Sequence, residues 1–151
     1  IHPMSHLQGA AIGKGCSVGP YARLRPGTVL SEGARVGNFV ETKKANIGPK
    51  SKVNHLSYMG DCDLGAEVNI GAGTITCNYD GVNKHQTDIG NGVFVGSNST
   101  LVAPLQIEGQ GFVAAGSTIT GNVGKRELAV SRARQRNIEG WVRPGTRDTK
   151  D

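Results

Sequence analysis

Aromatic residues and long apolar runs are scarce in this chain of 151 residues, and both absences narrow the fold. Only 5% of residues are aromatic and 36% are hydrophobic, whereas glycine occurs 23 times. This composition suits a narrow column of aliphatic side chains with many tight corners. No run is long and apolar enough to cross a membrane, and no signal peptide is recognisable, so no membrane partner is expected.

Cysteine is also rare, and its pattern argues against disulfides and metal binding. Cys16, Cys62 and Cys77 form an odd set without metal-like spacing, which is typical of a protein in a reducing cytoplasm. The sequence lacks an initiator methionine and starts at Ile1, which already falls on a repeat position. We therefore expect the natural protein to extend upstream and this chain to be an excised C-terminal domain.

The net charge of +5 and the pI near 9.3 predict anionic partners. No DNA- or RNA-binding motif is present, so a nucleic-acid partner is not expected. A small anionic substrate or a phosphorylated cofactor explains the charge equally well.

What the sequence has in abundance is a six-residue repeat. An aliphatic residue recurs at about every sixth position and is usually followed by glycine. The fifth residue of each unit is small or β-branched, with Leu105 as the oversized exception, which suits a second inward position on a short strand. Such units predict an all-β parallel β-helix. The aliphatic positions are Ile12, Val18, Leu24, Leu30, Val36, Ile47, Val53, Met59, Leu64, Ile70, Ile89, Val95, Leu101, Ile107, Val113 and Ile119.

Two breaks in the repeat divide the chain. The pattern lapses between Ile70 and Ile89, where Asn-Tyr-Asp-Gly at 78–81 is strong turn chemistry, so we predict a loop insertion at about 72–88. After Ile119 the pattern decays. The predicted β-helix thus covers residues 1–123, and residues 124–151 form a basic extension whose Trp141 is expected to cap the last coil.

The repeat can be indexed by face if three units make one triangular coil. Outward residues of the units starting at 24, 42 and 59 then share a face: Arg25, Glu41, Lys43 and Tyr58. Arg25 and Lys43 fall in adjacent coils at the same offset, about 5 Å apart. Because stacked cations repel one another, this pair predicts a bound phosphate or carboxylate. The alternative is a solvated basic face with counterions.

His55 falls on a corner between this face and the one that carries Asn69. A histidine there can act as a general base near neutral pH. A surface histidine in a solenoid is often incidental, but the neighbouring cation pair, carboxylate and phenol favour catalysis. His2, His6 and His85 offer no comparable argument.

Several segments identify a family more specifically than the repeat does. The segments GPYARLRPGT, VGNFVETKKA, VNHLSYMGD, NIGAGTITCNYDG and VFVGSNSTLVAP resemble the acetyltransferase domain of the bacterial bifunctional GlmU family. These are N-acetylglucosamine-1-phosphate uridyltransferases and glucosamine-1-phosphate acetyltransferases. The resemblance runs from residue 1 to about 144, and residues 145–151 match nothing recognisable.

The resemblance implies a left-handed parallel β-helix that forms a homotrimer with active sites between subunits. It also implies acetyl transfer from acetyl-CoA to the 2-amino group of glucosamine 1-phosphate, in UDP-N-acetylglucosamine synthesis for the bacterial cell envelope. No metal is needed for this step, because the magnesium of the family belongs to an upstream uridyltransferase domain absent from this chain.

The resemblance assigns roles residue by residue. His55 matches the general base, and Glu41 is expected to orient that base or hold the sugar amine. The expected substrate-binding residues are Arg25, Lys43, Tyr58, Asn69 and Lys84. The expected acetyl-CoA contacts are Ala72, Asn78, Tyr79, Ser97, Ala115 and Arg132. Backbone N–H groups near Ala72 or Ser97 are candidates to stabilise the thioester oxyanion.

Two other interpretations stay open from the sequence, and a third is excluded. A related hexapeptide acyltransferase would act on another acceptor, such as serine or a nucleotide sugar, although the cation pair favours a phosphorylated acceptor. A trimerisation module would show no turnover. A γ-class carbonic anhydrase shares the architecture, but its three zinc-binding histidines cannot be assembled here.

Overall fold

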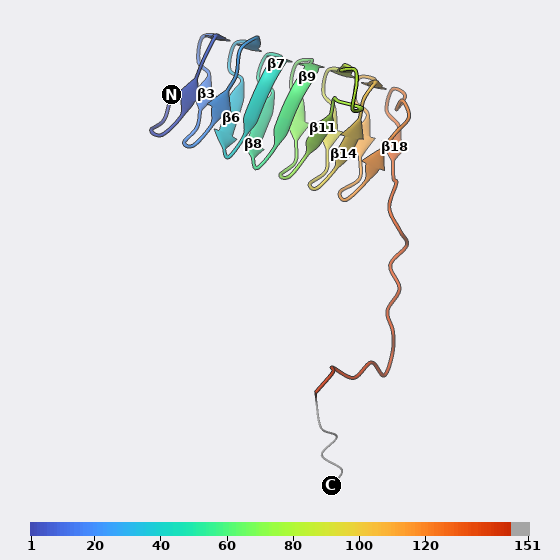
Figure 1. Ribbon diagram of the computed structural model, residues 1–151. Coiled ribbons are helices and arrows are strands. Elements are labelled where there is room, and N and C mark those ends of the chain that lie inside the picture. The colour runs from blue at the N-terminus through green and yellow to red at the C-terminus, as the bar shows by residue number, and fades with distance from the viewer. Residues whose placement is uncertain (146–151) are drawn as a thin grey trace.

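Short parallel strands wind through residues 6–129 of the computed structural model, which describes residues 1–145 (Figure 1). The strands stack coil upon coil, so that each strand pairs with its equivalents in the coils before and after it. The parallel β-helix predicted from the repeat is therefore confirmed. The described residues include no helix, and hence none that is long and apolar enough to cross a membrane.

Each coil contributes a strand to three faces. Face 1 consists of β1 (His6–Leu7), β4 (Arg23–Leu24), the start of β7 (Glu41–Ile47), the start of β9 (Tyr58–Leu64), β11 (Ile75–Cys77), β14 (Thr100–Val102) and β17 (Thr118–Ile119). Face 2 consists of β3 (Ser17–Val18), β6 (Arg35–Asn38), β8 (Lys52–His55), β10 (Asn69–Ile70), β13 (Phe94–Val95), β16 (Phe112–Val113) and β18 (Leu128–Ala129). Face 3 consists of β2 (Ala10–Ile12), β5 (Thr28–Leu30), the ends of β7 and β9, β12 (Thr87–Ile89) and β15 (Leu105–Ile107).

The repeat places its aliphatic residues in one central column. From Val18 to Ile119 these positions are buried, and the small residues at the second inward position are buried beside them from Ala22 to Ser117. Even the oversized Leu105 is only 3% exposed. Two hexad positions hold threonine instead of an aliphatic residue, Thr42 and Thr76, and both side chains are buried. Their hydroxyls are satisfied, because Thr42 bonds Thr28 and Thr76 bonds the backbone of Gly60.

The glycines that follow the aliphatic residues allow the coils to stack closely. A β-carbon on Gly48 would lie 2.1 Å from the carbonyl oxygen of Gly65 in the next coil, and one on Gly37 would lie 1.9 Å from that of Asn54. A larger residue would force these backbones apart. At these positions glycine is needed because the backbone of the next coil leaves no room for a β-carbon.

The structure narrows the predicted loop and extends the solenoid at its end. The first part of the segment 72–88 remains in the coil as β11, where Thr76 replaces the aliphatic residue. The excursion therefore begins at Asn78 and ends before β12. Within the predicted extension 124–151, β18 pairs with β16 and adds a strand to face 2. The segment after β18 runs away from the coils (Figure 1), and Trp141 within that segment is exposed, so it does not cap the last coil within this chain. Residues 146–151 lie outside the described residues.

Candidate functional site

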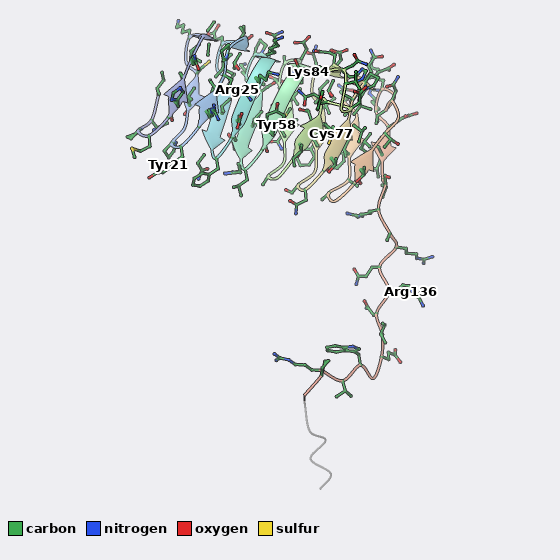
Figure 2. All side chains as sticks on the ribbon, viewed as in Figure 1. Tyr21, Arg25, Tyr58, Cys77, Lys84 and Arg136 are labelled. Carbon is green, nitrogen blue, oxygen red and sulfur yellow. The ribbon has the colours of Figure 1, made fainter. Side chains whose placement is uncertain are left out.

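Face 1 carries the first group of predicted site residues. The register pairs Glu41 with Tyr58 and Leu24 with Thr42, so Arg25 and Lys43 follow at the same offset in adjacent coils. This confirms the sharing of a face that the repeat predicts. Figure 2 shows Arg25 and Tyr58 over the middle coils, with Lys84 nearby at the upper edge.

The two stacked cations each have a carboxylate partner within the chain. Arg25 Nη1 lies 3.0 Å from Glu41 Oε1, in a pair whose side chains are about one third exposed (37% and 34%). Lys43 Nζ lies 3.9 Å from Asp61 Oδ2, and this pair is more buried (16% and 13%). The stacking of Arg25 on Lys43 therefore does not by itself require a bound anion, since the two carboxylates already offset part of the repulsion between the cations. Glu41 contacts Arg25 and makes no contact with His55, so it does not orient the His55 imidazole directly in this structure.

Lys84 brings a third cation to the cluster. Its amine forms a side-chain contact with Lys43, and this contact is the main cause that lowers the pKa of Lys43. Burial and the charge of Arg25 lower that pKa further, whereas Asp61 raises it. We call Arg25, Lys43 and Lys84 the cation cluster. Such a convergence of positive charge suits a small, multiply charged anion such as a phosphate group.

The corner between face 2 and face 1 carries the second group. His55 ends β8 and pairs in register with Asn38. Its imidazole is exposed and bonds no other described residue. Because Val53 pairs with Ile70, Ile70 with Val95 and Val95 with Val113, the residues two positions later stack in the same order. These residues form one column along the corner, which we call the corner column: His55, Ala72, Ser97 and Ala115.

The corner column offers free backbone donors beside the histidine. The carbonyl of Ala72 accepts from the Asn98 N–H at 2.7 Å, and that of Ser97 accepts from the Gly116 N–H at 2.8 Å. The N–H groups of Ala72 and Ser97 donate to no acceptor among residues 1–145. Such N–H groups can stabilise a developing oxyanion. At the end of the column, Arg132 donates a hydrogen bond to the carbonyl of Ala115.

Asn69 lies on face 2, in register with Lys52 and Phe94, and makes no side-chain contact with the cation cluster. It borders a hollow of about 480 Å³ together with Arg35 and Lys52. A hollow of about 750 Å³ lies on face 3, lined by Asp63 and Asp88 among others, away from the predicted residues. Within the single chain, the cation cluster lies on face 1, the corner column lies where face 2 passes into face 1, and Asn69 lies on face 2.

The loop after β11 is internally braced. Asp80 accepts hydrogen bonds from the N–H groups of Val82 (2.8 Å) and Asn83 (2.6 Å), and lies 2.7 Å from His85 Nε2. The hydrogen bond with His85 is the main cause that lowers the pKa of the Asp80 carboxyl far below its usual range. Tyr79 and Lys84 form an antiparallel bridge across the loop. The loop thus has a fixed shape that places Lys84 beside Lys43.

The sequence interpretation missed three of these residues. Asp61 was not considered, although it follows Gly60 directly beyond the predicted face. The turn motif accounts for Asp80 without a partner, and the sequence offers no argument for a role of His85. The spacing Asp-x₄-His across a predicted loop was the available signal for their pairing. Among residues 1–145 no group of three or more His, Cys, Asp or Glu side chains is arranged to hold a metal ion.

Comparisons with known proteins add a close relationship. No family model matches the chain. The bifunctional protein GlmU of Marinobacter nauticus is 62% identical over 144 residues, which are 95% of this chain and 32% of that protein. GlmU of Alkalilimnicola ehrlichii is 60% identical over 147 residues, which are 97% of this chain and 32% of that protein. The chain thus spans about a third of the length of these curated relatives.

Solved structures share the architecture at low sequence identity. The GDP-perosamine N-acetyltransferase of Caulobacter crescentus, in complex with CoA and GDP-perosamine, superimposes with a TM-score of 0.59 at 18% identity, covering 84% of this chain and 53% of that one. The acetyltransferase domain of PglB from Neisseria gonorrhoeae, in complex with acetyl coenzyme A, gives a TM-score of 0.56 at 18% identity, covering 82% and 55%. At this level of identity the likeness supports the fold.

Proposed function

The chain corresponds to the C-terminal part of the bifunctional GlmU proteins, and from this premise we propose that it transfers the acetyl group of acetyl-CoA to the 2-amino group of glucosamine 1-phosphate. This step would serve UDP-N-acetylglucosamine synthesis for the bacterial cell envelope. One observation carries the proposal beyond the relationship itself: the corner column stacks a histidine directly on free backbone donors, and face 1, which begins at this corner, carries three converging cations.

The chemistry requires an unprotonated amine that attacks a thioester carbonyl. His55 takes the proton as the amine nitrogen forms a bond to the carbonyl carbon. The carbonyl oxygen becomes an oxyanion, which the N–H groups of Ala72 or Ser97 stabilise from the same column. The carbon–sulfur bond then breaks, and the proton held by His55 passes to the departing CoA sulfur. Atoms and charge balance without a metal ion.

The cation cluster holds the phosphate of the acceptor. A phosphate group bound there would also offset the repulsion among the three cations. Tyr58, on the same face, contacts the sugar, and Glu41 holds Arg25 in place. In this scheme Glu41 acts on the phosphate side of the site, which differs from the expected roles of orienting His55 or holding the sugar amine.

Acetyl-CoA lies along the corner column. Ala72, Ser97 and Ala115 give the pantetheine arm a continuous backbone edge, with Asn78 and Tyr79 of the loop beside it. Arg132, at the far end of the column, faces the phosphorylated end of CoA. In this proposal the anionic partner of the exposed basic tail is the phosphorylated end of CoA and not a nucleic acid.

The proposal includes a homotrimer in the cytoplasm. The corner that carries His55 also exposes a run of apolar side chains in successive coils, with Tyr21 and Phe39 stacked at 5.5 Å and Leu56 following. Association along this corner would cover them and bring the Asn69 face of a neighbour to the site. None of the three cysteines forms a disulfide, which suits a reducing compartment. Light scattering that gives the mass of one chain would contradict the trimer.

The test compares two acceptors on the purified chain. CoA release is followed with acetyl-CoA and either glucosamine 1-phosphate or unphosphorylated glucosamine. We expect turnover only with the phosphorylated sugar. Equal rates with the two sugars would refute the phosphate site. Serine is tested as a further acceptor, and turnover with it would favour a different acyltransferase. No turnover with any of these acceptors would favour a trimerisation module.

A further inference from the structure

One carboxylate joins the cation cluster to the loop. Asp61 lies at the corner between face 1 and face 3, one residue beyond the position that pairs with Lys43. Its side chain is 13% exposed and contacts both Lys43 Nζ, at 3.9 Å, and the side-chain amide of Asn78. No other described acidic side chain contacts both a member of the cluster and the loop.

The backbone at Asp61 is unusual in a way that suits this position. Its φ of +47° is left-handed, a conformation that aspartate, asparagine and glycine adopt more readily than other residues. The corresponding corner of earlier coils holds Gly9, Gly27 and Lys44, all with positive φ. An acidic side chain at this corner points back towards Lys43 from the previous coil and towards Asn78 in the next.

Asn78 is the root of the loop. It is 8% exposed, and its carbonyl accepts the His85 N–H at 2.8 Å, so it ties the outgoing strand to the returning one. Fixing Asn78 therefore fixes the base of the segment that carries Lys84.

Resting on the proposed function, we propose that Asp61 is a positioning residue: its carboxylate holds the Lys43 amine in the cation cluster and, through Asn78, anchors the loop that brings Lys84 to the same phosphate. Asp61 does not touch the substrate in this scheme. It acts on the substrate through two other residues.

The role of Asp61 has a distinctive dependence on pH. The charged groups that face Lys43 are Arg25 from the end of β4, Lys84 from the loop and Asp61 from β9, and only Asp61 favours the protonated amine. Without its carboxylate, Lys43 should lose its proton at lower pH, and phosphate affinity should fall off sooner on the alkaline side. At acidic pH the loss of a negative charge near the anion should leave affinity unchanged or higher.

The experiment titrates the full chain with inorganic phosphate, and measures KM for glucosamine 1-phosphate, from about pH 6 to about pH 10, the range that spans histidine and lysine titration. Asp61→Asn removes the charge but keeps an oxygen for Asn78 and tolerates the left-handed backbone. We expect affinity at the alkaline end to fall about tenfold or more, the size of one charge-assisted contact, with no loss at the acidic end.

Asp63→Asn is the matched control. Asp63 lies two residues further along β9, is exposed on face 3 and bonds Asn46. This variant should keep the wild-type pH profile. Should Asp61→Asn fail to fold, Asp61→Gly, which suits the backbone as at Gly9 and Gly27, replaces it in the same titration. Because glycine also removes the contact with Asn78, this variant should lose affinity at all pH values and lose clearly more at the alkaline end.

If a folded Asp61 variant kept the wild-type phosphate affinity at alkaline pH, the inference would be overturned. An equal loss of affinity at all pH values would overturn it too, because such a loss indicates only structural damage. A wild-type chain that binds no phosphate would overturn it too. A wild-type chain that binds phosphate with the expected profile but transfers no acetyl group would refute the proposed function alone.

Discussion

The coil at 71–77 depends on a hydrogen bond in the core, and this dependence can be tested with one isosteric change. Thr76 occupies an aliphatic position of the repeat and is 1% exposed. Its hydroxyl accepts from the Gly60 N–H at 2.8 Å and donates to the Gly60 carbonyl at 3.0 Å. Thr76→Val keeps the shape but leaves the Gly60 N–H buried without a partner.

An unsatisfied buried donor costs about 1–3 kcal/mol. With an m-value of about 2 kcal/mol/M in urea, typical of small proteins, the unfolding midpoint of Thr76→Val should fall by roughly 1 M. Far-UV circular dichroism is the suitable readout, because the only tryptophan, Trp141, lies exposed on the tail and would not report on the solenoid.

Thr87→Val is the matched control. Thr87 is fully buried in β12, and its hydroxyl has no hydrogen-bond partner among the described residues. Replacing that hydroxyl by a methyl group removes a desolvated polar atom, so the midpoint should stay or rise. Equal destabilisation by the two substitutions would refute the reasoning, because it would trace the loss to packing and not to the hydrogen bond.

Two further predictions concern stacking and the loop. Gly48→Ala should destabilise the solenoid by about 1–3 kcal/mol in the same urea assay, since its β-carbon meets the Gly65 carbonyl, whereas Gly121→Ala, with open space around it, should be neutral. Asp80→Asn should loosen the loop and raise KM for the phosphorylated acceptor. Because the folded-state pKa of Asp80 is depressed, its bracing of His85 is present above the unfolded-state pKa and is lost only as pH falls through the folded-state value. A Gly48→Ala midpoint equal to wild type, or protease sensitivity of the loop unchanged in Asp80→Asn, would contradict these predictions.

The repeat predicted the architecture because a solenoid has local rules. Each aliphatic residue from Val18 to Ile119 occupies the core, and glycines such as Gly37, Gly48 and Gly71 mark close backbone approaches, so the six-residue spacing, with three units to a coil, predicted the register of the faces. The sharing of a face by Arg25, Lys43 and Tyr58 followed from that register.

The same rules failed where a polar residue stands in the core. Thr76 satisfies its hydroxyl on Gly60, a partner in the preceding coil that the local pattern does not reveal. The aliphatic pattern therefore lapses at β11 although the coil continues there, and the predicted loop begins several residues too early. A threonine at an aliphatic position can be recognised as inward only once the neighbouring coil is known.

The repeat also does not predict which side chains of adjacent coils form ion pairs. The repeat stacks Arg25 on Lys43 but does not reveal the carboxylate partner of either one. The resemblance implies that Glu41 orients His55 or holds the sugar amine, and neither the repeat nor the resemblance points to Asp61. The exact direction of a side chain at a corner depends on a left-handed backbone, as at Asp61, which no six-residue average predicts.

The central claim is that the corner column is the reacting edge of an acetyltransferase, with His55 as its base. The most direct test measures kcat and KM for CoA release by His55→Ala, with His6→Ala on β1 as the control. We predict that kcat of His55→Ala falls by roughly 10²–10⁴ with little change in KM, since a positioned general base contributes about that factor, and that His6→Ala is unchanged. A His55→Ala rate close to wild type would contradict the account.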